Sequence, residues 1–313
     1  MDISGYLKSI DWEEESYPSY NDYLALPLLL VFFPVLHFFL DRLIFEKVGR
    51  RLIGLNDEKI DNEKLKKFKK FKESTWNFIY VVSAQTLSLL VTYKEPWFTN
   101  TTYYWVDEGN QVWPNLKIKF KLKFLYMYAT GYYSYSIFTL AFWETKRSDF
   151  RPRMGHHVAT AILIILSYMT RFYRPGSVVL ALHVTGDIFL EIGKMSKYSG
   201  YEGVATLAFL LFFLSWILLR LVYFPFWVIW STSYECSKLL DMREHQKDGP
   251  ILYYTFNYLL YFLFYLHIYW LVLFYRTLKK KFNARGGVCK ICDISVTIIS
   301  PMMTSKKMSK KIT

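Results

Sequence analysis

The chain has 313 residues, of which 53% are hydrophobic and 20% aromatic, and its formal net charge is +13. This composition favours an integral membrane protein over a large soluble domain, because Trp and Tyr concentrate at membrane–water interfaces. The lysines cluster in loops between apolar runs, so we expect anionic lipid headgroups or an anionic small molecule as partners, and no nucleic acid. The three cysteines form no disulfide framework.

Seven apolar windows are long enough to span a bilayer, which takes about 20 residues per helix. They are approximately 23–44, 74–92, 124–143, 155–173, 177–192, 204–230 and 251–275. The sequence therefore predicts an all-α polytopic membrane protein with about seven transmembrane helices. Pro27, Pro34 and Pro225 lie inside windows and predict kinks. Residues 1–22 are polar and acidic, so we expect no cleaved signal peptide.

The distribution of basic residues predicts the orientation. Alternate loops (45–73, 144–154, 193–203 and 276–313) hold 26 Lys and Arg residues, whereas the opposite set holds 11. Cytosolic loops carry the excess of positive charge. We therefore expect a lumenal N-terminus over 1–22, a first span over 23–44, a basic cytosolic loop over 45–73, a transmembrane domain over 74–276 and a cytosolic tail over 277–313. The tail lacks sustained periodicity from about Phe282 and is expected to be disordered.

Two short motifs agree with this orientation. Asn100-Thr101-Thr102 is an N-glycosylation sequon in a predicted lumenal loop. The chain ends Lys310-Lys311-Ile312-Thr313, which resembles a dilysine retrieval signal of the endoplasmic reticulum and acts only on a cytosolic tail. A chance lysine pair in a basic tail is the alternative.

Two connecting segments have regular patterns. Residues 55–73 place Leu65, Phe68 and Phe71 at three-residue spacing, which predicts an amphipathic helix on the cytosolic surface. Residues 116–123 alternate with period two, which fits either a strand or a helix start with lysines that reach toward water.

Polar side chains gather in the fourth and fifth windows. His156 and His157 begin the fourth window, and His183, Asp187 and Glu191 follow at four-residue spacing in the fifth. Residues spaced by four lie along one stripe of a helix. Each ionisable group inside a bilayer costs about 2.5–3.5 kcal/mol on insertion scales, so such groups normally face a polar interior. We predict that the two stripes meet and form a site.

The chemistry of this site favours proton transfer. A histidine beside a carboxylate can take a proton from a nucleophile and return it to a leaving group. A cationic loop before the histidines suits a phosphorylated donor such as a coenzyme A thioester. Together these features favour acyl transfer to a membrane-soluble amine or alcohol. The residues expected to bind substrate around the predicted catalytic set are His183, Glu191, Arg147, Asp149, Arg151 and Arg153.

These residues also have alternative interpretations. Adjacent helical residues point about 100° apart, so one of His156 and His157 could have a structural role. Six histidines are too few for the repeated clusters of a membrane desaturase, and Cys289 and Cys292 are a lone C-x-x-C, so no metal is expected. Three further histidines are expected to be structural or exposed: His37, His245 and His267. Three charged residues inside spans are expected to pair or to reach toward the interface: Asp41, Arg42 and Arg220.

The run WETKRSDFRPRMGHHVAT (143–160), with GSVVLALHVTGDIFLEIGKMSKYSG (176–200), resembles the Lag motif of ceramide synthases. Segments such as VTYKEPWFTNTTYYW and PFWVIWSTSYE are similar to the plant branch, whose ASC1-like members are linked to resistance against sphinganine-analogue toxins. The resemblance implies a six-helix bundle around a cavity, in an enzyme of the endoplasmic reticulum membrane. It implies transfer of an acyl group from acyl-CoA to a sphingoid base, with no bound cofactor, and leaves a homo- or heterodimer open. The catalytic residues that it implies are His156, His157 and Asp187.

The chain departs from this family pattern at one acid. The family has an aspartate directly after the position of His183, where this chain has Val184. Gly186 replaces a small hydroxyl residue, and Arg151-Pro152-Arg153 replaces an uncharged stretch. Because valine transfers no proton, the alternative is a non-catalytic relative that binds or senses sphingoid bases.

Overall fold

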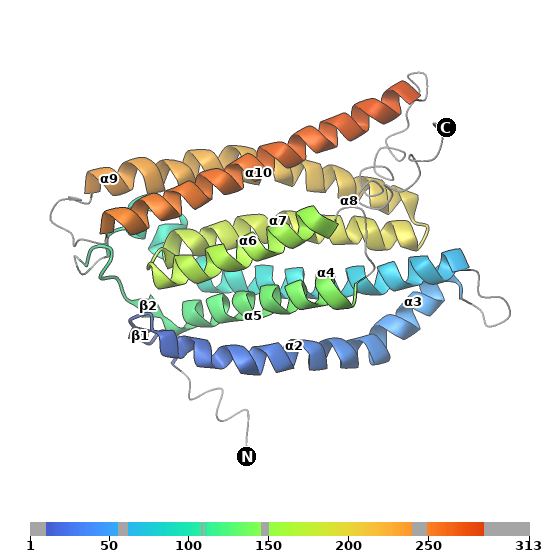
Figure 1. Ribbon diagram of the computed structural model, residues 1–313, viewed down its shortest axis with the longest axis horizontal. Helices are drawn as coiled ribbons and strands as arrows, with labels where there is room; N and C mark the ends of the chain where they lie inside the picture. Colours follow the sequence, from blue (N-terminus) through green and yellow to red (C-terminus); the bar gives the residue numbers. More distant parts are fainter. Residues whose placement is uncertain are drawn as a thin grey trace, which may run out of the picture.

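The computed structural model describes residues 11–55, 62–107, 109, 111–144, 150–239 and 249–284. In this part of the chain, long helices lie roughly along one common axis (Figure 1). The predicted sites at Arg147, Asp149, His245, Cys289, Cys292 and 310–313 lie outside it. The helices are η1 (Tyr20–Ala25), α2 (Leu26–Leu40), η2 (Asp41–Phe45), α3 (Glu46–Ile53), α4 (Asn62–Thr92), α5 (Phe120–Phe142), α6 (Phe150–Met169), α7 (Tyr173–Tyr198), α8 (Glu202–Ser215), η5 (Trp216–Ile229), η6 (Ser231–Glu235), α9 (Cys236–Leu239) and α10 (Gly249–Ala284), with short 3-10 turns η3 (Pro96–Phe98) and η4 (Thr101–Tyr104).

The all-α prediction is confirmed, because each apolar window coincides over most of its length with a helix or with consecutive helical elements. Among the described residues, four segments are long and apolar enough to cross a membrane: Tyr20–Ile53, Tyr173–Tyr198, Glu202–Leu239 and Tyr253–Arg276. The protein is therefore a membrane protein with several apolar helices. The number of seven spans stays a prediction.

The helix ends separate into two groups at opposite ends of the bundle (Figure 1). The ends of α3, α5 and α7, with the starts of α4, α6 and α8, lie at one end, which we call the basic end because its loops carry the excess of Lys and Arg. The strands β1 (Glu15–Ser16) and β2 (Ile118–Lys119), the α6–α7 turn and α9 lie at the other end. The orientation was predicted by assigning successive loops to alternate sides of the membrane, and the arrangement of the helix ends agrees with that assignment.

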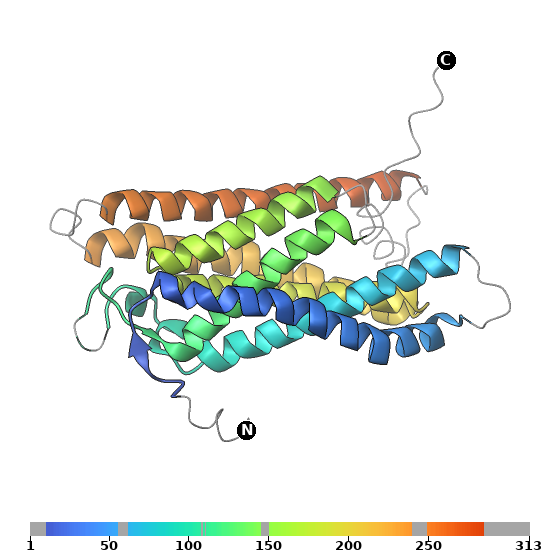
Figure 2. The ribbon, with the colours of Figure 1, turned by 60° about the horizontal axis from the view of Figure 1, so that its bottom comes forward.

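Helix α7 occupies the middle of the bundle. It packs against α4, α8 and η5, and it also contacts α6. Helices α2 and α10 lie along opposite edges, and a second view places α2 on the outer face in front of α5 (Figures 1 and 2). A polar residue on α7 therefore meets other helices instead of lipid. This position explains how α7 carries His183, Asp187 and Glu191 in the middle of an apolar span.

The outer helical segment η1–α2–η2–α3 is held by polar contacts at several depths. Near one end, Lys123 Nζ lies 3.0 Å from Asp22 Oδ2. In the middle, His37 stacks on Trp76 with ring centroids 4.3 Å apart, and its Nδ1 lies 2.8 Å from the Tyr135 hydroxyl. His37 is therefore structural, as expected.

Toward the basic end, Lys72 Nζ pairs with Asp41 Oδ2 at 2.6 Å, which is the pairing expected of Asp41. Arg42 also pairs, with its Nη1 3.7 Å from Glu46 Oε2.

The segment expected to lie on the membrane surface has a different structure. Residues 62–73 continue without a break into the second apolar window and form one helix, α4. Phe68 and Phe71 are buried, and both lie close to Gly49 of α3. The predicted helix is therefore confirmed over 62–73, but the predicted position of its aromatic side chains on the surface is wrong, because they pack against α3.

The segment 116–123, whose sequence alternates with period two, contains both a short strand and a helix start, which are the two structures that the sequence left open. Ile118 and Lys119 form β2, which pairs antiparallel with β1, and α5 begins at Phe120. Lys119 and Lys121 both lie close to the buried Glu95, at 3.0 and 2.7 Å from its Oε1. The lysines therefore make ion pairs at the end of the bundle that carries the strands.

Candidate active site

Two cavities meet inside the bundle between α6, α7 and η5. The inner cavity has a volume of about 50 Å³, and the wider cavity has a volume of about 160 Å³. Five residues line both cavities: Tyr133, His156, Asp187, Arg220 and Leu263. We call the polar members of this group, Tyr133, His156, Asp187 and Arg220, the junction residues.

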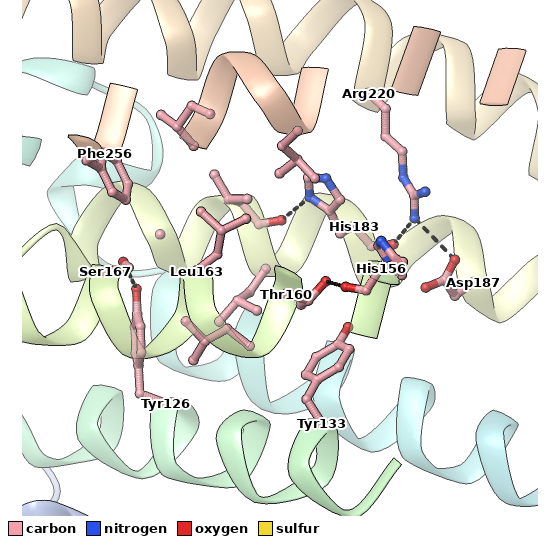
Figure 3. A pocket seen from close by; sticks show the side chains of 16 residues that line it. Tyr126, Tyr133, His156, Thr160, Leu163, Ser167, His183, Asp187, Arg220 and Phe256 are labelled. Atoms are coloured by element: carbon pink, nitrogen blue, oxygen red, sulfur yellow. Dashed lines mark hydrogen bonds and ion pairs between the residues drawn. The ribbon is translucent and has the colours of Figure 1, made fainter. Parts of the chain in front are cut away.

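The inner cavity runs from the junction residues toward the end of the bundle that carries the strands. Figure 3 shows His156, Asp187 and Arg220 at one end of it, and Tyr126, Ser167 and Phe256 at the other. The walls between are aliphatic, with Leu163, Ile164, Val179, Leu180 and Leu260 among them. At the far end, the Tyr126 and Ser167 hydroxyls are hydrogen-bonded at 2.9 Å. Such a lining suits an apolar chain.

The wider cavity lies toward the basic end and is lined by charged and aromatic groups. Arg153 and Lys194 provide positive charge there, and both have acidic partners. Arg153 Nη2 lies 3.0 Å from Glu144 Oε2, and Lys194 Nζ lies 2.7 Å from Glu191 Oε1. A ligand in this cavity therefore meets both cationic and anionic groups.

An ion pair organises the junction residues. Arg220 Nη2 lies 3.1 Å from Asp187 Oδ1 and donates a second hydrogen bond to the His183 carbonyl oxygen at 2.6 Å. The Arg220 side chain is only 6% exposed, whereas that of Asp187 is 33% exposed, and Asp187 lines both cavities. The carboxylate is therefore held by the guanidinium and still accessible to a ligand beside His156 (Figure 3).

The two adjacent histidines have different positions. His156 lines both cavities, whereas His157 lines the wider cavity and contacts the Tyr133 ring, with ring centroids 5.8 Å apart. Their own ring centroids are 5.9 Å apart. This divergence follows from the rotation of about 100° between helix neighbours. His156 is therefore the histidine at the point where the cavities join.

His183 is part of a second histidine pair. Its Nδ1 lies 2.6 Å from the Val179 carbonyl oxygen, and its Nε2 lies 2.8 Å from Nε2 of His267 on α10. His267 is 2% exposed and lines the wider cavity. The sequence placed His267 among structural or exposed histidines, so its place at the cavity was not predicted.

The remaining predicted site residues lie in different places. Glu191 and Arg153 line the wider cavity, and their binding of substrate stays a prediction. Arg151 lies in the first turn of α6, and its side chain is outside the described structure, as are Arg147 and Asp149 altogether. Asn100 is exposed at the start of η4, where its side chain accepts a hydrogen bond from the Thr102 amide at 3.0 Å.

Sequence reasoning did not place Arg220 or Tyr133 in the site. Arg220 was expected only to pair or to reach the interface, and the pairing is confirmed with Asp187 as its partner. A single buried cation in an apolar window was the available signal, because such a charge needs a counter-ion inside the protein. Tyr133 is one of many tyrosines, 26 in all, and carried no comparable signal.

Val184 is the position at which the chain departs from the family pattern. Its side chain is 3% exposed and lines the wider cavity, one turn from Asp187. An acid at this position would therefore face the cavity and not lipid. The departure changes the polar lining of the site itself.

Comparison with known proteins supplies the family. The TLC domain matches residues 70–276 of this chain. The chain belongs to the TLC domain family. This match covers the junction residues and both cavities, so the whole candidate site lies in the TLC domain.

Proteins similar to this chain over most of its length include named ceramide synthases. The ASC1-like protein of Solanum lycopersicum is 60% identical over 281 residues, covering 88% of this chain and 92% of that protein. Ceramide synthase LOH1 of Arabidopsis thaliana is 56% identical over 293 residues, covering 91% and 94%. Alternaria stem canker resistance protein 1 of Solanum lycopersicum is 48% identical over 283 residues, covering 90% and 92%. The resemblance seen in the sequence is thereby confirmed.

The ion pair makes a prediction about stability. We expect Arg220→Leu to lower the melting temperature of the solubilised protein, because it leaves the Asp187 carboxylate without its guanidinium, at a cost on the order of 1–3 kcal/mol. Adding Asp187→Asn should recover part of the loss, because the unpaired charge is then removed. Thermal unfolding of the two single variants and the double variant measures this coupling. Additive losses would contradict an energetic role for the pair.

Proposed function

We propose that this protein is a ceramide synthase, which transfers a fatty acyl group from acyl-CoA to the amine of a sphingoid base such as sphinganine. The observation that carries the proposal is the meeting of an apolar cavity and a polar cavity at His156, Asp187 and Arg220. Homology to named ceramide synthases over about nine-tenths of the chain supports the same reaction.

The two cavities suggest where the parts of the substrates bind. The inner cavity, with aliphatic walls, suits the part of the acyl chain next to the thioester. The thioester carbonyl then lies at the junction residues, and the coenzyme A phosphates extend toward the basic end, near Arg153 and Lys194. Cationic side chains and phosphates form strong charge-assisted hydrogen bonds. The amine of the sphingoid base enters the wider cavity beside His156.

The chemical step requires a group that accepts the amine proton and transfers it to the leaving group. The neutral amine attacks the thioester carbonyl, the carbon–sulfur bond breaks, and the amine proton passes to the coenzyme A thiolate. We assign His156 to this transfer, either as the base or as a transient acyl acceptor that is regenerated by the amine. Asp187 lies beside it and stabilises positive charge on the imidazole or on the attacking nitrogen, while Arg220 holds the carboxylate in place.

The assignment predicts the effect of removing each histidine. His156→Ala should lower acyl transfer by about 10²–10⁴-fold, the usual contribution of an acid–base group. His157→Ala should also lower it greatly, because His157 lines the cavity proposed for the amine. The measurement is acyl-CoA-dependent ceramide formation in microsomes that lack other synthases, normalised to protein abundance.

His37→Ala is the control, because His37 lies on the outer helix away from both cavities and packs on Trp76. It should keep most of the activity in protein that remains folded. Turnover in both His156→Ala and His157→Ala equal to that of the unchanged protein would refute the histidine assignment. Mass spectrometry of the protein after incubation with acyl-CoA alone distinguishes the base from the acyl acceptor.

Val184 provides a test of how active the site is. We expect Val184→Asp to raise ceramide synthesis, because positions 184 and 187 share a helix face and the new carboxylate joins the wider cavity. Asp187→Asn should remove the activity that is present. Val184→Ala is the matched control for the change in volume. An unchanged rate in folded Val184→Asp protein would show that a second acid is dispensable here, and two inactive proteins that bind sphinganine would favour the sensing alternative.

The orientation is also part of the proposal. We place the protein in the endoplasmic reticulum membrane with the basic end and the C-terminus in the cytosol, on the strength of the 26-to-11 bias in Lys and Arg. A C-terminal tag should then be cleaved by protease in intact microsomes, and Asn100 should carry a glycan that Asn100→Gln removes. A C-terminal tag protected from protease would overturn this orientation.

A further inference from the structure

The wider cavity is lined by several residues whose buried polar atoms make no hydrogen bond in the described part of the chain. Four residues that line this cavity each carry a buried side-chain atom that makes no hydrogen bond in the described part of the chain: His157 Nδ1, Glu191 Oε2, Trp216 Nε1 and His267 Nδ1. Leaving a buried polar group unpaired costs about 1–3 kcal/mol. Unpaired atoms collected around one cavity therefore mark a place where a ligand supplies the missing partners.

The hydrogen-bond network assigns the tautomer of His267. His183 Nδ1 faces the Val179 carbonyl oxygen at 2.6 Å, so this nitrogen carries a proton, and Nε2 of a neutral His183 is then an acceptor. His267 Nε2, which lies 2.8 Å from it, must donate. The other nitrogen of a neutral His267, Nδ1, is consequently an acceptor. This atom is buried and meets no hydrogen-bond geometry among the described residues.

Trp216 supplies the complementary donor. Its indole Nε1–H can only donate, and the residue is 7% exposed. Its ring contacts the His267 ring edge-on, with centroids 5.9 Å apart and an interplanar angle of 76°. The Arg220 guanidinium carbon lies 4.1 Å from the centroid of the Trp216 ring, and Phe274 also packs against this ring. One unpaired donor and one unpaired acceptor are therefore held on neighbouring, rigid rings.

The chemistry of the pair indicates its ligand. An ammonium group only donates and a carboxylate only accepts, whereas a hydroxyl does both. A sphingoid base carries hydroxyls on the carbons that flank its amine carbon, and the proposed function places that amine in this cavity beside His156. We propose that Trp216 and His267 form a subsite that recognises a hydroxyl of the sphingoid base. This inference rests on the proposed function and names specificity residues that lie apart from the acyl-transfer step.

The test compares substrates that differ by one hydroxyl. We would measure kcat/KM for sphinganine, 1-deoxysphinganine and 3-deoxysphinganine. Trp216→Phe and His267→Phe should lower the value for sphinganine by about 10–100-fold, the loss of one hydrogen bond in a buried site, and should leave the value for one deoxy analogue unchanged. His267→Gln should retain much of the preference, because its amide donates to His183 and its carbonyl oxygen accepts from the ligand.

Trp227→Phe is the matched control. Trp227 also lies on η5 with a buried indole nitrogen, but it is not among the described residues that line either cavity. This variant should keep the preference of the unchanged protein. If Trp216→Phe and His267→Phe lower kcat/KM equally for all three amines, or leave the preference unchanged, the pair does not recognise a hydroxyl and a bound water satisfies it instead.

Direct binding separates this inference from the proposed function. Binding of the same three amines to the purified full-length protein requires no turnover. A protein that forms no ceramide but loses its preference for sphinganine on Trp216→Phe would refute the proposed function and retain the subsite. Equal binding of all three amines to the unchanged protein would overturn the subsite, whatever its activity.

Discussion

The buried cation Arg220 determines how the centre of this protein is arranged. Placing a charge within a membrane-embedded bundle is costly unless the protein supplies partners. Asp187 supplies the counter-charge, the His183 carbonyl accepts a second hydrogen bond, and the Trp216 ring covers the guanidinium. Two of these partners belong to α7 and one belongs to η5 itself. Satisfying the cation therefore fixes η5 against the middle of α7 and places the carboxylate between the two cavities.

The helix that carries Arg220 is itself unusual. From Trp216 to Ile229 the chain forms a π-helix, with Pro225 inside it. Proline has no backbone N–H, so it cannot continue the regular hydrogen-bond ladder, and a local change of helix type adjusts the backbone around it. Wider turns of this kind occur frequently at functional sites because they reposition side chains. Here the same segment carries Trp216, Arg220 and Phe224, which all contact residues around the cavities.

The division of the interior into an apolar and a polar cavity matches the chemistry of joining two amphipathic molecules. The aliphatic walls of the inner cavity lie away from the basic end, and the charged groups of the wider cavity lie toward it. A substrate with one apolar and one charged part is therefore oriented before any reaction. The junction residues lie where those two parts would meet, so binding and alignment of the reacting atoms have the same structural cause.

The sequence alone was sufficient for the features that depend on local pattern. Apolar windows predicted the helices, and four-residue spacing predicted that His183, Asp187 and Glu191 share one stripe, because hydrophobicity and helical periodicity are properties of neighbouring residues. The tertiary structure alone decided which partners these residues have. Arg220 is 33 residues from Asp187, and His267 is 84 residues from His183. Such contacts depend on how whole helices pack, and no local pattern in either segment specifies its distant neighbour. For the same reason, the spacing of Phe68 and Phe71 predicted a helix on the membrane surface, whereas in the structure both side chains pack on α3.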